Sequence, residues 1–275
     1  LGTDVAFRKD VQEVKLHSGQ LKVAKNLRFL LKNSEIHDSH KDCSRVQDVY
    51  SLRCIPQVHG ASREMLENIF NIIENEINSV SDNPIVLSKT NEILSAGHFH
   101  AEIVAQALDS AAIAVTSFAT ISERRIYALI DGEFGLPPFL VDDPGINSGY
   151  MMFQVTAASL VSENKTLSHP ASVDSIPTGA GQEDHVSMAP WAGRKLLTII
   201  KNTENILAIE LLLATQALYF RQDLKPGKEL ISIYNHLKEN INKMNHDKLF
   251  DEELNFSIDL ITTGNILNYI SNKIN

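Results

Sequence analysis

Helical periodicity constrains the fold of this chain more than any other feature of its sequence. Acidic residues and asparagines fill one face of residues 62–80, and the apolar residues recur at steps of three and four: Met65, Leu66, Ile69, Phe70, Ile73 and Ile77. This spacing predicts an amphipathic helix. The sequence SDNP at 81–84 ends it, because proline disfavours helix in the residue before it.

Further segments show the same helical character. We predict helices over residues 101–130, 149–167, 185–222, 227–242 and 257–273, the third of them bent near Pro190. Strand candidates are few, and they suggest only a short ribbon. We therefore predict an all-α fold: a long-helix bundle with at most a short β-ribbon near 85–100, forming a single helical domain over residues 1–275.

Composition excludes several classes of partner. The formal net charge is −9, with Lys and Arg interspersed among the acids, so the chain lacks the basic patch of a nucleic-acid-binding protein. The most apolar stretch, 206–220, is too short to span a membrane and is interrupted by Glu210 and Gln216. Two cysteines, Cys43 and Cys54, are expected as reduced thiols in a cytoplasmic protein. We expect neither a nucleic-acid nor a membrane partner.

Residues 46–60 gather polar side chains that could carry chemistry. In a helix, Gln47, Tyr50 and Arg53 fall on one side at one-turn spacing. The arginine fork suits a carboxylate, and a tyrosine can act as a base where its surroundings lower its pKa. Spacing alone still favours exposed polar positions on an ordinary helix.

Alternate residues in GHFHAE at 97–102 could ligate zinc through His98, His100 and Glu102. A catalytic zinc site needs three such ligands and an open position. No other segment repeats a ligand spacing, so we expect no metal site. On the same view Phe99 is a core aromatic.

The segment GAGQEDHVSM at 179–188 permits two interpretations. Acids are favoured in the first turn of a helix, and Asp184 or Ser187 could cap one. Alternatively, an apolar pocket would raise the pKa of Glu183 toward that of a useful base. Spacing alone favours the helix start.

Taken in order, these motifs resemble a known family. QDVYSLRC, SDNP, GHFHAE, SERRI, GLPPFLV, SENK-L-HPASVDS-PT and QEDHVSM occur in the order found in the histidine ammonia-lyases, within the aromatic amino-acid lyase family. The resemblance runs from about Gly2 to about Arg221. It implies non-oxidative elimination of ammonia from L-histidine to give trans-urocanate, as part of histidine degradation.

The same resemblance implies a prosthetic electrophile, MIO (4-methylidene-imidazole-5-one), formed from an internal Ala-Ser-Gly in the N-terminal half of the family's chain. This sequence contains no Ala-Ser-Gly and begins at Leu1, not at a methionine. We therefore expect it to be the C-terminal part of a longer lyase, with no cofactor of its own and inactive by itself. The family implies a homotetramer with active sites shared between chains.

The resemblance also assigns roles to individual residues. Arg53 matches the arginine that binds the substrate carboxylate, and Tyr50 matches a tyrosine beside the electrophile that helps to handle protons. Gln47 belongs to the same motif. Two departures stand beside matched positions: Val49 replaces the usual proline, and His98 replaces an asparagine.

Three more positions match the family's active site. Asn83 matches a polar asparagine, Phe99 an aromatic packed near the electrophile, and Glu183 a glutamate that contacts the imidazole or helps to move a proton. Phenylalanine and tyrosine lyases usually carry an amide at this last position, so Glu183 favours histidine as the substrate. The alternatives are a phenylalanine or tyrosine ammonia-lyase, an aminomutase, or a non-catalytic helical scaffold.

Overall fold

A computed structural model describes residues 2–40, 45–132, 134–270 and 274. Its α-helices are α1 (Lys9–Gln12), α2 (Ser18–Leu30), α3 (Glu35–Asp38), α4 (Tyr50–Arg53), α5 (Ile55–Ile77), α6 (Glu102–Ile130), α7 (Met151–Leu167), α8 (Ala189–Tyr219), α9 (Ile231–Asn240) and α10 (Asp251–Thr262). Five short 3₁₀ helices accompany them: η1 (Val5–Phe7), η2 (Pro138–Leu140), η3 (Gly179–Gly181), η4 (Lys228–Leu230) and η5 (Asn265–Tyr269).

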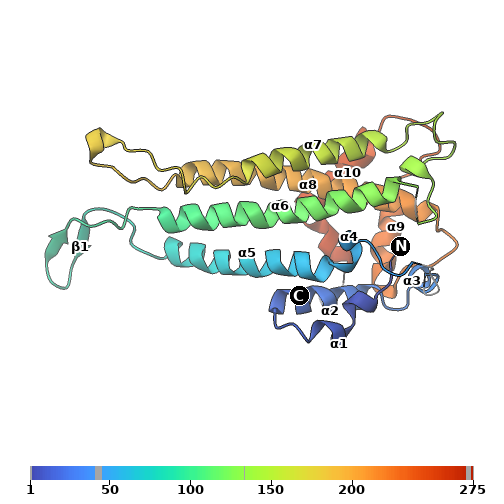
Figure 1. Ribbon diagram of the computed structural model, residues 1–275, viewed down its shortest axis with the longest axis horizontal. Helices are drawn as coiled ribbons and strands as arrows, with labels where there is room; N and C mark the ends of the chain where they lie inside the picture. The colour runs from blue at the N-terminus through green and yellow to red at the C-terminus, as the bar shows by residue number, and fades with distance from the viewer. Residues whose placement is uncertain (1, 41–44, 133, 271–273, 275) are drawn as a thin grey trace.

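The long helices α5, α6, α7 and α8 lie side by side and form the body of the molecule (Figure 1). α6 packs against the other three. Small residues make this close approach possible, since Ala105, Ala112 and Ala119 of α6 are all buried. The all-α bundle predicted from the sequence is confirmed.

α6 is long and apolar enough, by length and composition, to cross a membrane, and no other helix of the described ranges passes that test. A core helix of a globular protein passes it equally well. α6 behaves as such a core helix, because it packs against α5, α7 and α8.

A two-stranded ribbon projects from one end of the bundle (Figure 1). β1 (Ile85–Leu87) pairs antiparallel with β2 (Glu92–Leu94), placing Ile85 opposite Leu94. This is the short ribbon predicted near residues 85–100, which connects α5 to α6.

Some helix boundaries differ from the sequence prediction, and a proline or a glycine lies near each of them. α5 begins at Ile55, because Pro56 falls in its first turn, where a proline costs no hydrogen bond. Pro190 likewise lies in the first turn of α8 and does not bend it. In place of one helix over 257–273, α10 ends at Thr262, and Gly264 with φ +70° leads into η5; residues 271–273 lie outside the described part.

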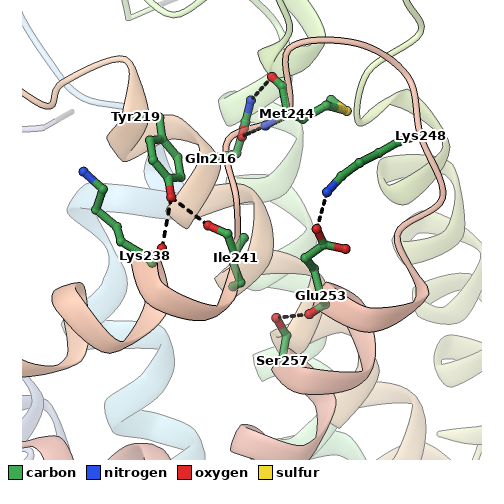
Figure 2. Close-up of polar contacts among 8 residues, drawn as sticks. All are labelled: Gln216, Tyr219, Lys238, Ile241, Met244, Lys248, Glu253 and Ser257. Carbon is green, nitrogen blue, oxygen red and sulfur yellow. Dashed lines mark hydrogen bonds and ion pairs between the residues drawn. The ribbon is translucent and has the colours of Figure 1, made fainter.

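The C-terminal segment is fastened to α8 by a buried amide (Figure 2). The Gln216 side chain donates to the carbonyls of Leu140 and Met244, at 2.8 and 2.9 Å, and accepts from the Met244 N–H at 3.0 Å. One turn later the Tyr219 hydroxyl donates to the Ile241 carbonyl at 2.7 Å. These contacts tie the segments after α8 to the end of the bundle opposite the ribbon.

Candidate active site

Gln47, Tyr50 and Arg53 are brought together at the start of α4. The Arg53 guanidinium donates to the Asp48 carbonyl at 2.9 Å and to the Gln47 side-chain oxygen at 2.7 Å. It also lies 4.5 Å from the centre of the Tyr50 ring. The Tyr50 side chain is 71% exposed, so its phenol faces solvent. The bonds to Gln47 and Asp48 fix the Arg53 guanidinium beside it.

Val49 has a proline-like backbone conformation at a position where the family usually has proline. It is the N-cap of α4, with φ −61° and ψ 154°. Proline fixes φ near −65°, so valine here adopts a proline-like conformation without the ring. The departure from the family pattern therefore leaves the direction of α4 compatible with that pattern.

A cavity of about 660 Å³ opens beside Tyr50, between α4, α5, α6 and α7. Cys54, Arg124 and Lys165 contribute to its lining. Cys54 is a free thiol, as expected, while Cys43 lies outside the described residues. Arg124 and Lys165 bring cationic groups to this cavity, and the Arg124 guanidinium is ion-paired with the Glu123 carboxylate.

Phe99 and Glu183 meet at the opposite end of the bundle. Both line a cavity of about 520 Å³ formed by the segment before α6 and the loop before α8. Phe99 is 58% exposed, so it is not the core aromatic of the simpler interpretation. Glu183 is also exposed, so the described residues do not enclose it in an apolar pocket.

A tight turn holds Glu183 in place. The Thr178 N–H donates to the Glu183 carbonyl at 2.9 Å, and the Glu183 N–H donates to the Thr178 carbonyl at 3.3 Å. The Thr178 hydroxyl also donates to the Glu183 carboxylate. Gly179 has φ +57°, and a side chain there would contact the Glu183 carboxyl group. The absence of a side chain at Gly179 thus leaves room for the Glu183 carboxylate to pack against the turn.

The helix-start interpretation of the same segment is only partly correct. The N-cap of α8 is Met188, in a left-handed conformation with φ 57° and no side-chain cap. Ser187 accepts a long hydrogen bond from the Ala189 N–H, at 3.4 Å. Asp184 lies too far upstream to cap the helix, so that expectation was wrong.

Asn83 organises the base of the ribbon. Its side-chain oxygen accepts from the Ala96 N–H at 2.9 Å and from the Ser95 hydroxyl at 3.2 Å. These bonds join the residues that leave α5 to those that return toward Phe99, so Asn83 belongs to the ribbon end of the bundle.

The candidate residues therefore form two groups, separated by the length of α5. Tyr50 and Arg53 directly precede α5, whereas Asn83 follows it. A helix of 23 residues is about 35 Å long at 1.5 Å per residue. One chain cannot bring the Tyr50–Arg53 group and the Phe99–Glu183 group to the same substrate.

Comparisons with known proteins identify the family of this chain. Residues 1–239 match the family model of the aromatic amino acid lyases, and the chain belongs to that family. Among curated relatives, a histidine ammonia-lyase from Pseudoalteromonas atlantica is 46% identical over 275 residues, covering 100% of this chain and 54% of that protein. One from Stigmatella aurantiaca is 47% identical, covering 98% of this chain and 53% of its own length.

Solved structures show the same fold. The histidine ammonia-lyase of Trypanosoma cruzi superposes with a TM-score of 0.89 at 37% identity, covering 99% of this chain and 52% of that one. A tyrosine aminomutase from Streptomyces globisporus gives a TM-score of 0.90 at 29% identity, covering 100% of this chain and 57% of that one. The chain thus spans about half the length of the relatives it matches.

Proposed function

We propose that this chain is the C-terminal part of a histidine ammonia-lyase, which eliminates ammonia from L-histidine to give trans-urocanate in histidine degradation. The observation that carries the proposal is the identity of 46–47% to histidine ammonia-lyases along nearly the whole chain. Glu183 adds chemical support, because a carboxylate accepts an imidazole N–H better than it contacts a phenyl ring.

In the proposed reaction Arg53 binds the substrate carboxylate. Its hydrogen bonds to Gln47 and to the Asp48 carbonyl fix the guanidinium before the substrate arrives. Tyr50, exposed at the mouth of a cavity, is placed to hold or move a proton. Glu183 accepts the imidazole N–H at the other end of the substrate, with Phe99 against the ring and Asn83 holding the segment that carries it.

An MIO electrophile would supply the electron withdrawal that lowers the barrier to losing the weakly acidic β-proton. The family's electrophile arises from Ala-Ser-Gly, which this sequence lacks, so we place it in an N-terminal part of the parent protein. The residues present fit such a group: Tyr50 stands exposed at the cavity mouth, and the Arg53 guanidinium, fixed by Gln47 and the Asp48 carbonyl, lies beside it as a donor for developing negative charge.

We further propose a cytoplasmic homotetramer whose active sites are shared between chains. Support comes from the separation of the two residue groups by α5, since a second copy would have to supply the missing group. No role for nucleic acid or membrane enters this proposal.

Assays with three amino acids test the proposal. The reading frame that contains this chain is expressed in full, after sequencing its upstream part for Ala-Ser-Gly, and is given histidine, phenylalanine and tyrosine. We expect urocanate from histidine and little product from the others. A preference for phenylalanine or tyrosine would support the alternative lyase or aminomutase, whose fold is the same. A frame without the tripeptide and without turnover would support a non-catalytic scaffold.

Variants of the two carboxylates at 183 and 184 separate chemistry from folding. Glu183→Gln should lower kcat/KM for histidine at least tenfold, since a hydrogen bond to a charged group contributes about 1.5–3 kcal/mol. Asp184→Asn removes the neighbouring exposed carboxylate and should change kcat/KM little. The 275-residue chain alone should give no urocanate above background.

A further inference from the structure

Two imidazoles and a carboxylate converge at the ribbon end of the bundle. His100 and Glu102 stand at the beginning of α6, and His185 comes from the loop before α8. One ligand atom of each lies within 4.8 Å of the others. The His100 and His185 rings are tilted by 34°, with centroids 5.6 Å apart. Sequence spacing grouped His100 and Glu102 with His98 but could not find His185, which lies 83 residues after Glu102.

Hydrogen bonds leave one free ligand atom on His100 and one on Glu102. Nε2 of His100 lies 3.1 Å from the His185 carbonyl oxygen, which can only accept, so Nε2 carries the proton and Nδ1 keeps a lone pair. Metal-bound histidines commonly donate their second ring N–H to a carbonyl in this way. Oε1 of Glu102 accepts from Gln106 at 2.8 Å, while Oε2 is buried with no hydrogen-bond partner among the described residues. A buried acceptor without a partner is costly unless something else binds it.

The surrounding charge favours a cation. The cavity beside this cluster is lined by the carboxylates Glu183 and Asp184, and its described lining includes neither lysine nor arginine. Glu102 lies in the first turn of α6, where the positive end of the helix dipole faces its carboxyl group.

We propose that His100, Glu102 and His185 bind a divalent cation of the zinc class. Two imidazoles and one carboxylate form a three-ligand set that leaves a fourth position open. Bonds of about 2.0–2.1 Å in a tetrahedron require ligand atoms roughly 3.4 Å apart, so the cluster must contract. His185 is exposed, and rotation of its side chain supplies that contraction. The bound cation joins the segment that carries Phe99 to the loop that carries Glu183.

This inference departs from the expectation of no metal and does not depend on the proposed lyase activity, since binding is measured without turnover. The protein is first dialysed against a chelator, and Zn²⁺ is then titrated by calorimetry, with Co²⁺ absorption reporting the geometry. We expect one tight equivalent per chain, a tetrahedral Co²⁺ spectrum and a higher melting temperature with Zn²⁺ than without it.

Single substitutions distinguish this site from weak binding by the ten histidines of the chain. His185→Asn and Glu102→Gln should each weaken the tight equivalent at least tenfold; the second keeps an oxygen for the bond from Gln106. His98→Asn, two residues before His100 and exposed, is the matched control and should bind like the unmodified protein. Circular dichroism confirms that each variant folds. Absence of a tight equivalent, or equal binding by His185→Asn, would overturn the proposal.

Discussion

At the scale of single residues, burial beside the ion pair between α6 and α8 keeps His59 neutral. Arg125 donates to both oxygens of the Glu210 carboxylate, and the Ser122 hydroxyl donates to the same group. His59 lies against this pair, with Nε2 3.4 Å from an Arg125 nitrogen and its ring 5.2 Å from that of Phe118. Burial, as the largest cause, and the charge of Arg125 lower the pKa of His59 to about 4, and Glu210 opposes them in part.

This neutral histidine predicts a specific pH dependence of stability. The pKa of His59 is about 6.5 in the unfolded chain and about 4 in the folded protein, so between these values the unfolded state binds the extra proton. The free energy of unfolding should therefore fall as pH drops from 6.5 toward 4. By pH 5 the loss from this group is about 2 kcal/mol, at 1.36 kcal/mol per pH unit.

Denaturant unfolding at several pH values between 5 and 7 measures this loss. In His59→Gln the fall in stability should be about 2 kcal/mol smaller than in the unmodified protein. His98→Asn, which removes an exposed histidine, should keep the original slope. An unchanged slope in His59→Gln would show that the pKa of His59 is the same in the folded and the unfolded chain.

At the scale of elements, two glycines set the crossing of α2 and α5. A side chain on Gly60 would overlap the backbone of Gln20, and one on Gly19 would overlap the Gly60 carbonyl. The two helix backbones therefore meet directly, which only glycine permits on both sides. This contact fixes where the N-terminal segment docks on the bundle.

Alanine substitutions at two helical glycines should have opposite effects. Gly60→Ala forces α2 and α5 apart and should lower the free energy of unfolding by about 1–3 kcal/mol. Gly193→Ala in α8 places its methyl 3.6 Å from Leu108, an ordinary contact, and should raise stability by about 0.5–1 kcal/mol through helix propensity. Thermal or denaturant unfolding measures both, and equal losses at the two positions would contradict this account of the crossing.

Helices could be predicted from the sequence where the periodic spacing of apolar and small residues is uninterrupted. The pattern of residues 101–130 corresponds to α6 within one residue, because an uninterrupted apolar and small-residue repeat leaves no competing structure. The start of α5 was missed because Pro56 signals a break, yet a first-turn proline is tolerated. The left-handed Met188, which sets the start of α8, carries no sequence signal at all.

Local contacts of the candidate site could be anticipated from the sequence, but the meeting of residues distant in the chain could not. Arg53 contacts both Gln47 and Tyr50, but Gln47 lies before α4, so the helix assumed from the spacing is not what brings Gln47 to Arg53. The meeting of Phe99 with Glu183, and of His100 with His185, depends on how α6 and α8 align, which no local pattern encodes. The roles proposed for these residues remain predictions.

At the scale of the whole molecule, the bundle leaves large apolar side chains on its outer surface. Phe70 and Ile77 of α5 are 66% and 76% exposed, and Leu197 of α8 is 70% exposed. An apolar surface of this kind marks an interaction face. The separation of the two residue groups by α5 is a reason to expect another copy of the chain to cover these apolar side chains.

We therefore predict that the chain self-associates through these helices. Sedimentation velocity or light scattering should show oligomers at micromolar concentration, with Leu197→Asp shifted toward the monomer. Burying one leucine contributes about 1.5–3 kcal/mol, so this substitution should weaken association at least tenfold. Leu16→Asp alters a side chain that is 93% exposed but lies outside the bundle, and should leave association unchanged. A monomer at all concentrations would remove the structural support for shared active sites and would leave the two residue groups as separate sites on one chain.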